Sequence, residues 1–253
     1  MFRIWSIVRG VSILLGLLLL VVSILWVEAT RTSKVCSLVD IVINGNEAQH
    51  FVSKATLHEK ITEQCGAPVV GQPLHALKTH FIENTIKSNS FVRRGIVYKN
   101  LRGHLKVIVT LKQPIARVLL ENASGKYIDE QGELLPLSDY CTARVPIVTV
   151  ETLPRIAGNL CESAHGANVL KLLRYINGDP FWQAQIAYIH IDTQGKILMH
   201  TQVSKQCVEF GYPEDIERKF DKLLLFYQKI VPHKGWNTYK RVNLEFARQI
   251  ICE

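Results

Sequence analysis

The sequence lacks the short motifs that mark the common catalytic and metal sites. No HExxH, GxSxG, GxGxxG or phosphate-binding loop occurs in it. Its six cysteines lie far apart, without a CxxC step or a Cys/His spacing suited to zinc. His58 and Glu59 form the only His–Glu step, and no second histidine follows at the spacing of a zinc peptidase. These absences disfavour an enzyme, and we expect the chain to need neither a cofactor nor a metal.

Acidic residues are fewer than basic ones, 22 against 30, so the formal net charge is +8. The basic residues are scattered along the chain, and positions 93–94 and 240–241 are the densest pairs. A nucleic-acid-binding surface would instead gather basic residues beside stacking aromatics. We therefore expect no nucleic-acid partner and interpret the charge as a solvated basic surface near anionic lipid headgroups.

Long hydrophobic runs are also absent, except for one near the N-terminus. Residues 10–27 (GVSILLGLLLLVVSILWV) hold 18 positions without a charged side chain. As a helix this run would span roughly 27 Å, close to the hydrocarbon thickness of a bilayer. Trp5 and Trp26 lie near its two ends, where tryptophan anchors a helix at the membrane interface. The run predicts a single transmembrane helix.

Arg3 and Arg9 precede this run. The positive-inside rule therefore places residues 1–9 in the cytoplasm and the rest of the chain, after a polar connector at 28–37, outside it. The alternative is a cleaved signal peptide, because Val27-Glu28-Ala29 would pass as a cleavage site. The run is longer than the ~7–15 apolar residues of a signal peptide, which favours the retained anchor.

An extracytoplasmic location permits disulfides, and Cys141 with Cys161 is the pair that would strain the chain least. The chain does not need such a bridge for stability. With 253 residues, of which 47% are hydrophobic, it can bury a core of one large domain or two small ones.

Residues 38–113 predict a small module of strands and helices. The expected elements are a strand at 38–43, a helix at 53–65, a helix from residue 73, and strands at 91–98 and 105–111. Ser53 is a suitable N-cap, Gly66 a suitable helix stop, and Pro73 suits the first turn of a helix. This β-α-α-β-β order places two helices on one face of a small sheet.

Residues 114–253 predict a mixed β domain with helices. The expected strands lie at 115–120, 127–128, 133–137, 145–150, 186–191, 196–202, 207–211 and 241–251, and the helices at 164–176 and 213–231. His190 and His200 lie on the two strands of one expected hairpin, and we interpret them as a surface pair and not as metal ligands. The predicted fold class is α+β.

The stretch YIDEQGELLPL, residues 127–137, gathers three carboxylates beside a tyrosine. An acid/base pair of a glycosidase type needs two carboxylates ~5–10 Å apart across a cleft. Asp129 and Gly132 are instead the residues of a tight turn, since Asp caps its own backbone and Gly tolerates positive φ. The stretch predicts a hairpin whose carboxylates point into water, followed by a strand that Pro136 keeps at an edge.

The last expected strand covers residues 241–251. Apolar Val242, Leu244 and Phe246 alternate there with polar residues, which is typical of a half-buried strand. A strand at the edge of a sheet offers unpaired N–H and C=O groups, to which a partner segment can add by β-augmentation.

Four segments carry a resemblance to a known family. They are 106–117 (KVIVTLKQPIAR), 127–138 (YIDEQGELLPLS), 145–148 (VPIV) and 235–251 (GWNTYKRVNLEFARQII). In their order and spacing they resemble the FtsQ/DivIB family of bacterial cell-division proteins, and the last looks like the version seen in the Bacteroidetes group. The resemblance covers nearly the whole chain: an anchor, a POTRA-type module and a C-terminal β domain.

The resemblance implies a non-enzymatic scaffold of the division machinery. Such a protein would cross the inner membrane once, with its N-terminus in the cytoplasm and its C-terminal domain in the periplasm, and would act at the division septum. Its partners would be FtsB/DivIC-like and FtsL-like proteins and other divisome components. Leu111-Lys112 stands where the family often has an acidic residue before the Gln-Pro or Pro-Ile-Ala step, and six cysteines are more than the family usually has.

The last strand matches the strand with which the family binds its partner. The residues that the resemblance implies for this contact are Arg241, Val242, Asn243, Leu244, Glu245, Phe246, Ala247, Arg248, Gln249, Ile250 and Ile251. If Val242, Leu244 and Phe246 point inward, the residues between them face the partner and set specificity.

Two other functions compete with the division scaffold. A POTRA-containing component of outer-membrane protein assembly or secretion would share the first module, but would usually carry repeated POTRA units or a long β-barrel. A membrane-anchored enzyme of the cell envelope would carry catalytic residues in a pocket. Depletion distinguishes them, because it would give filamentous cells, loss of outer-membrane proteins or accumulation of a substrate, respectively.

Overall fold

The computed structural model describes residues 14–26, 34–45, 51–120, 123–138, 140–151 and 159–253. The described chain divides into two compact units. One comprises residues 52–111 with the chain up to residue 44, and the other comprises residues 112–253 with Phe51. The expected cytoplasmic segment at 1–9, residues 10–13 and 27 of the expected anchor, and most of the expected connector lie outside the described residues.

Within the expected anchor, residues 14–26 are helical and their side chains are exposed. No helix within the described ranges is both long and apolar enough to cross a membrane.

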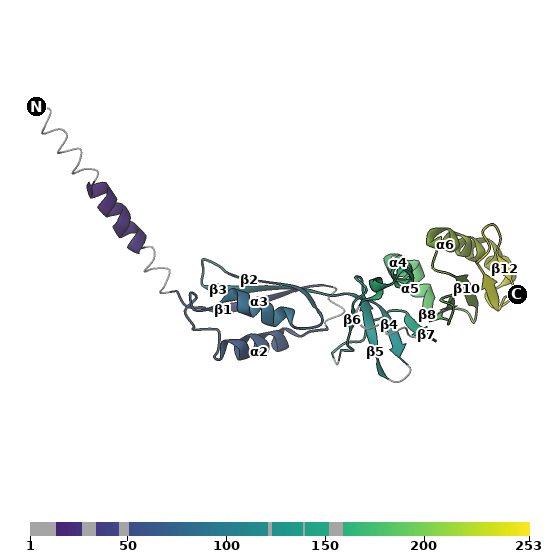
Figure 1. The fold of residues 1–253 in the computed structure, drawn as a ribbon, viewed down its shortest axis with the longest axis horizontal. Helices are drawn as coiled ribbons and strands as arrows, with labels where there is room; N and C mark the ends of the chain where they lie inside the picture. Colours follow the sequence, from purple (N-terminus) through teal and green to yellow (C-terminus); the bar gives the residue numbers. More distant parts are fainter. Residues whose placement is uncertain (1–13, 27–33, 46–50, 121–122, 139, 152–158) are drawn as a thin grey trace, which may run out of the picture. The chain divides into compact units, whose positions relative to one another are not determined.

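The first unit contains a three-stranded sheet in the order β1-β3-β2, formed by β1 (Leu38–Asn44), β2 (Val92–Lys99) and β3 (His104–Leu111). Strand β1 runs parallel to β3, and β2 runs antiparallel to it. A parallel pair needs a crossover connection, which α2 (Lys54–Cys65) and α3 (Thr79–Lys87) supply before the chain enters β2. Figure 1 shows both helices on one face of the sheet, as expected.

Local capping explains where α2 begins and ends. The Ser53 hydroxyl accepts a hydrogen bond from the Thr56 N–H at 3.0 Å, and Gly66 ends the helix at φ +69° with its N–H on the Glu63 carbonyl. Both predicted caps are confirmed. The expected start of the second helix at Pro73 is wrong, because α3 begins at Thr79. Residues 73–74 instead pair with the segment before β1, where the Leu74 N–H donates to the Lys34 carbonyl.

The core of the first unit lies between the helices and one face of the sheet. In β3 the alternate residues Leu105, Val107 and Val109 are buried, as the period of two in a strand requires. Ile86 of α3 packs directly on β2 at Gly95, where a Cβ atom would lie 3.0 Å from its side chain.

The second unit contains a nine-stranded sheet in the order β12-β11-β10-β9-β8-β7-β4-β5-β6. Its strands are β4 (Pro114–Leu120), β5 (Ala123–Asp129), β6 (Leu134–Leu135), β7 (Ile147–Val150), β8 (Ile186–Ile191), β9 (Ile197–Thr201), β10 (Cys207–Gly211), β11 (Arg241–Asn243) and β12 (Ile251–Cys252). Parallel and antiparallel pairs both occur, so the expected mixed β domain is confirmed.

The helical elements of this unit are η1 (Leu160–Glu162), α4 (Ala164–Gly178), α5 (Pro180–Gln185), α6 (Ile216–Leu225), the π-helical segment η2 (Phe226–Ile230) and α7 (Val231–Lys234). Helix α5 was not expected. The π-helical segment comes just before Pro232, whose ring would clash with the carbonyl four residues earlier in a regular helix.

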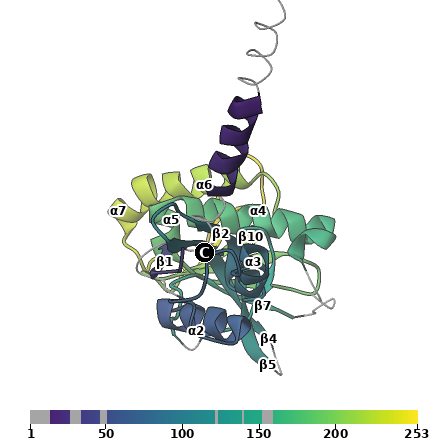
Figure 2. The ribbon, with the colours of Figure 1, turned by 90° about the vertical axis from the view of Figure 1, so that its left-hand side faces the viewer.

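Buried residues of the strands and helices form one hydrophobic cluster in this unit. Aromatic rings join its helices. The rings of Tyr175 on α4 and Phe220 on α6 are stacked at 4.8 Å, and Trp182 on α5 lies 4.7 Å from Phe220. Figure 2 shows α4 and α6 side by side, as these contacts require. This packing holds α6 against α4 and α5, and the ring of Phe220 also lies 5.5 Å from that of Phe210 on β10.

The acidic stretch at 127–137 is a hairpin turn, as expected. The Asp129 carboxylate accepts hydrogen bonds from the backbone N–H groups of Gln131 and Glu133, both at 2.9 Å, and Gly132 has φ +83°. The expectation that all its carboxylates point into water is wrong for Asp129, which is fully buried. Strand β6 follows the turn and lies at the edge of the sheet, also as expected.

Cys141 and Cys161, the pair that would strain the chain least, are not joined by a disulfide, and neither are the other cysteines, all of which lie in the described part of the chain. Their thiols face different backbone groups. Cys141 Sγ lies 3.8 Å from the Thr142 carbonyl, and Cys161 Sγ lies 3.8 Å from the Gln131 carbonyl.

Candidate functional site

The candidate site is the end of the nine-stranded sheet formed by β10, β11 and β12. Strand β11 pairs in parallel with β10, with Val242 opposite Val208. Strand β12 pairs antiparallel with β11, with Cys252 opposite Val242. Because β12 has one neighbour in the sheet, it is an edge strand, and β11, which carries the first predicted site residues, is not.

The hydrogen-bond register decides which backbone groups of β12 face outward. Arg241 and Glu253 exchange both backbone bonds at 3.0 Å, so they form a hydrogen-bonded pair. Pairs in an antiparallel ladder alternate, which makes the neighbouring pair of Val242 and Cys252 a non-hydrogen-bonded one. The N–H and C=O groups of Cys252 therefore point away from β11, toward the free edge.

The prediction of one continuous strand over 241–251 is wrong. The segment forms two short strands joined by a turn, and the second strand folds back on the first. Of the residues expected to point inward, Val242 and Leu244 are fully buried, but the side chain of Phe246 is 47% exposed. The apolar alternation of the sequence therefore holds for β11 and the residue after it, and ends there.

Two side chains turn the chain after β11. The Asn243 side-chain oxygen accepts the Glu245 N–H at 2.9 Å, which bends the backbone locally. The Lys222 ammonium, on α6, donates to the carbonyl oxygens of Leu244 and Phe246, both at 2.7 Å. A carbonyl that points at α6 cannot also continue a strand ladder, so a tertiary contact overrides the strand pattern.

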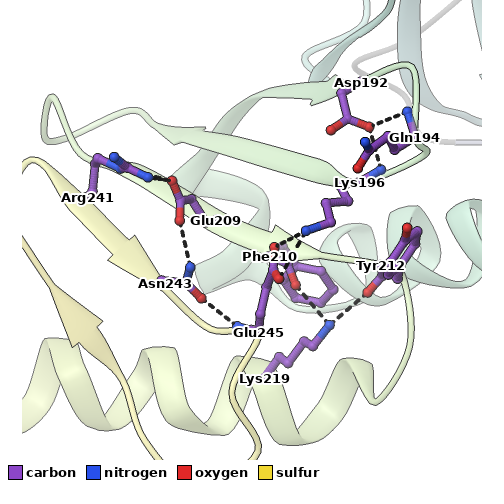
Figure 3. Close-up of polar contacts among 10 residues, drawn as sticks. All are labelled: Asp192, Gln194, Lys196, Glu209, Phe210, Tyr212, Lys219, Arg241, Asn243 and Glu245. Atoms are coloured by element: carbon purple, nitrogen blue, oxygen red, sulfur yellow. Dashed lines mark hydrogen bonds and ion pairs between the residues drawn. The ribbon is translucent and has the colours of Figure 1, made fainter.

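Polar side chains connect β10 to β11 on the sheet face opposite the hydrophobic cluster. Figure 3 shows the Glu209 carboxylate between Arg241 and Asn243. The Arg241 Nε donates to it at 2.9 Å, and the Asn243 amide donates to it at 2.7 Å. The bond to Glu209 raises the pKa of Arg241, with a smaller contribution from Glu253. This bridge fixes the register of the two strands.

Glu245 ties the turn to the hairpin of β8 and β9. Both of its carboxylate oxygens lie 3.2 Å from Lys196 Nζ, and this bond raises the pKa of Lys196 (Figure 3). Gly211 makes room for this contact. It has φ +71°, and a Cβ atom there would lie 2.6 Å from Cγ of Glu245.

Lys219 anchors the end of β10 to α6. Its ammonium donates to the carbonyl oxygens of Phe210 and Tyr212, at 2.8 and 2.7 Å, although the residue is only 7% exposed (Figure 3). Desolvation lowers the pKa of Lys219, and the positive charge of Lys222 lowers it further. Lys219 and Lys222 thus act one turn apart on α6, the first on β10 and the second on the turn after β11.

The structure separates the predicted site residues into four groups. Arg241 and Asn243 bind the Glu209 carboxylate, and Ile250 is partly buried against the hydrophobic cluster. Val242 and Leu244 belong to the core. The exposed residues of the turn are Glu245, Phe246, Ala247, Arg248 and Gln249. Ile251 is 36% exposed and lies on the edge strand itself.

The residues missed by the sequence reasoning are those that hold the site from outside the last segment: Lys196, Glu209, Lys219, Lys222 and Cys252. The sequence carries one signal for the lysines. Lys219 and Lys222 lie three residues apart on α6, each directly before a buried apolar residue, Phe220 and Leu223.

A cavity of about 560 Å³ lies elsewhere in the unit, near the start of α4, and both apolar and polar residues line it. Three of its polar residues have structural roles. Ser163 caps α4 by accepting the Gly166 N–H at 3.0 Å, Asn159 accepts the Cys161 N–H, and Asp192 accepts the N–H groups of the turn between β8 and β9. No group of three or more potential metal ligands was found among the described residues.

His190 and His200 do not face each other across the hairpin of β8 and β9. Strand pairing places Tyr188 opposite His200 and Leu198 opposite His190. His190 contacts Thr149 at 3.0 Å and Glu151 at 3.2 Å, both from the neighbouring strand β7 and the residue after it.

Comparison with known families finds two matches. Residues 113–253 match the family described as FtsQ/DivIB, C-terminal related, and residues 34–110 match the POTRA-like domain. No curated protein matches the chain. The first match covers more than half of the chain, includes the whole nine-stranded sheet and ends on the edge strand described above.

The two matches follow each other along the chain in the order that the resemblance implied, and the structure gives each a sheet of its own. The chain therefore belongs to the FtsQ/DivIB family of cell-division proteins, a non-enzymatic family, and is a scaffold of the division machinery.

Proposed function

We propose that this scaffold is anchored in the cytoplasmic membrane and works outside it. Residues 1–9 lie in the cytoplasm, 10–27 cross the membrane, and 28–37 connect to the units at 38–113 and 114–253. The apolar run and the preceding arginines support this topology, in which the folded units lie in the periplasm. Membership of the family supports a location at the division septum.

The partner-binding site is the free edge of β12. The single observation that carries this proposal is the register of the edge strand, which points the N–H and C=O groups of Cys252 away from the sheet. An extended partner segment can pair with these groups and add a further strand. The partners are an FtsB/DivIC-like protein and an FtsL-like protein, as in the family.

The exposed side chains beside the edge supply specificity. Ile251 lies on the strand, and Phe246 lies in the turn that precedes it, both partly exposed apolar residues of the kind that interface cores contain. Arg248 and Gln249 in the same turn offer polar contacts. All four belong to the segment that the family resemblance implies for this contact.

A pair of proline substitutions tests the docking edge. Cys252→Pro removes an outward N–H and leaves the bonds to β11 in place, so the variant should fold and lose the partner. Ile251→Pro alters the pairing with β11 and should lower stability as well. The full chain in detergent would be used to capture the FtsB/DivIC-like protein, with circular dichroism to check folding.

If folded Cys252→Pro binds the partner like the wild type, β12 is not the docking edge. If the wild type captures no such partner, the partner assignment itself is wrong. Depletion in cells tests the scaffold role separately, because loss of a division scaffold gives filamentous cells, whereas loss of an outer-membrane assembly component removes outer-membrane proteins.

A further inference from the structure

The position of β12 depends on the turn that precedes it. The strand has two residues, and only Ile251 and Cys252 are paired with β11 as part of the ladder. Glu253 adds a pair of backbone bonds to Arg241. Isolated short strand pairs are only marginally stable in water, so the β11–β12 pairing depends on the turn that directs the chain into β12.

Three kinds of side-chain contact shape the turn, and they differ in strength. The Lys196–Glu245 ion pair is about one-third exposed on both sides, and exposed pairs contribute little. Asn243 makes one local hydrogen bond to the Glu245 N–H. Lys222 makes two charge-assisted bonds from a single ammonium, and such bonds are about twice as strong as neutral ones.

Lys222 also connects the turn to a rigid element. It is on α6, whose residues Phe220 and Leu223 are buried in the core of the unit. The backbone of Lys222 is therefore held in a fixed position. From there its ammonium donates to two carbonyl oxygens that lie two residues apart in the turn, those of Leu244 and Phe246. Holding both oxygens sets the direction in which the chain leaves β11.

We propose that Lys222 is a positioning residue for the docking edge: by holding the turn at 244–246 against α6, it keeps β12 paired with β11 and its outward backbone groups ready for the partner. This inference rests on the proposed function of the β12 edge. Without the ammonium, the Leu244 and Phe246 carbonyls lose their donor, the turn opens and β12 separates from the sheet.

The test compares three variants of the full chain in detergent. Lys222→Met keeps the length of the side chain and removes the ammonium, Lys222→Arg keeps a cation that can donate to two oxygens, and Lys229→Met removes an exposed lysine farther along the same helical stretch. Hydrogen exchange at the Arg241 and Glu253 amides reports on the β11–β12 pairing, and exchange in the central strand β8 reports on the whole unit. Capture of the FtsB/DivIC-like protein reports on docking.

We expect Lys222→Met to speed exchange at the Arg241 and Glu253 amides by about tenfold to a hundredfold, because the turn loses both bonds from the ammonium. Exchange in β8 should stay unchanged, and partner affinity should fall by at least about tenfold. Lys222→Arg should restore both, and Lys229→Met should behave as the wild type. A merely structural lysine would change exchange in β8 together with the edge.

Two results would overturn the inference. One is unchanged exchange at the Arg241 and Glu253 amides in Lys222→Met, which would mean that the turn does not depend on the ammonium. The other is faster exchange there with unchanged partner affinity, which would mean that docking does not need an ordered β12. A wild type that captures no partner would instead remove the proposed function, and exchange alone would then decide whether Lys222 holds the turn.

Discussion

The two sheets of this protein treat their exposed edges in different ways. In the three-stranded sheet, the Glu83 carboxylate of α3 accepts the Val97 N–H of edge strand β2 at 2.9 Å. In the nine-stranded sheet, the outward N–H of Cys252 on edge strand β12 has no side-chain acceptor among the residues that the structure describes. One outward amide of β2 is bonded to a side chain of its own unit, whereas the outward amide of β12 is left open.

This difference shows how one chain can guard against unwanted pairing and still offer a strand for wanted pairing. Edge strands invite other chains to add to them, so proteins protect those that have no partner. Strand β2 has eight residues and so offers a longer edge for unwanted pairing than β12, which has two.

The largest effect on stability is expected when Lys219, which joins β10 to α6, loses its ammonium group. Lys219→Met leaves the buried Phe210 carbonyl and the Tyr212 carbonyl without their donor, and an unsatisfied buried acceptor costs about 1–3 kcal/mol. The free energy of unfolding of this unit should fall by about 2–3 kcal/mol. Urea unfolding followed by tryptophan fluorescence measures it, because Trp182 and Trp236 lie in the same unit.

The control is Lys229→Met, which removes an exposed lysine from the same helical stretch. A Lys219→Met protein as stable as the wild type would mean that solvent replaces the ammonium, and that β10 does not depend on α6 in the way described.

A smaller loss is expected at Gly211, where the turn beside the open edge is crowded. Gly211→Ala forces a side chain into a backbone with φ +71° and against the Glu245 side chain. We expect the free energy of unfolding to fall by about 1–2 kcal/mol. Combining it with Glu245→Ala should recover the part of this loss that comes from crowding, and a double-mutant cycle by thermal unfolding separates the two parts. Strict additivity would show that Glu245 does not crowd Gly211.

Removing the hydrogen bond from Val97 to Glu83 should lower the free energy of unfolding of the first unit by about 1 kcal/mol, and it would test the comparison of the two edge strands directly. Glu83→Ala leaves the Val97 N–H of β2 without its acceptor, so hydrogen exchange at this amide should become faster. The freed edge should also promote self-association, measurable by analytical ultracentrifugation. Glu83→Gln retains an acceptor oxygen and serves as the matched control. Unchanged exchange at Val97 in Glu83→Ala would show that the edge is protected by another means.

The Lys196–Glu245 pair should matter less than any of these contacts. Lys196→Ala should shift the melting temperature by less than about 2 °C and lower partner affinity only slightly, because exposed ion pairs are screened and cost side-chain entropy. The difference from the wild type should shrink further as salt rises. A loss of partner binding as large as that expected for Lys222→Met would assign the turn to Lys196 instead.

The smallest expected signal is a pH dependence of stability from Lys219. Its pKa in the folded protein is lowered by desolvation, so between that value and the ordinary lysine pKa of about 10.4 the unfolded chain binds more protons. This lysine therefore makes the free energy of unfolding rise with pH across that window. Urea unfolding at about pH 8 and about pH 10 should show a smaller rise in Lys219→Met than in the wild type. Parallel pH curves would contradict the lowered pKa.

Sequence reasoning succeeded where a few neighbouring residues decide the structure. Ser53 and Gly66 mark the two ends of α2, as predicted, because capping is a local hydrogen-bond requirement of a helix end. The turn at 129–132 formed as expected for the same reason. The strands β1, β3 and β8 also lie within a residue or so of their expected positions, since their apolar residues need one buried face.

It failed where a distant group decides the backbone. Residues 241–251 have the alternation of a strand, but Lys222, on another element, takes the carbonyl oxygens of Leu244 and Phe246 and ends the strand. The expected helix start at Pro73 failed because this segment pairs with residues before β1. Neither competing partner is close in the sequence, so no local pattern reports it.

The amino-acid sequence by itself determined the α+β class, most of the elements, the acidic turn and the family, because these follow from local hydrogen bonding, from the period of apolar residues and from motifs in a fixed order. Tertiary structure alone decided which strand lies at the edge and which of its backbone groups face outward. That choice depends on the strand register between β11 and β12 and on the reach of Lys222 from α6, contacts that exist only once the chain has folded.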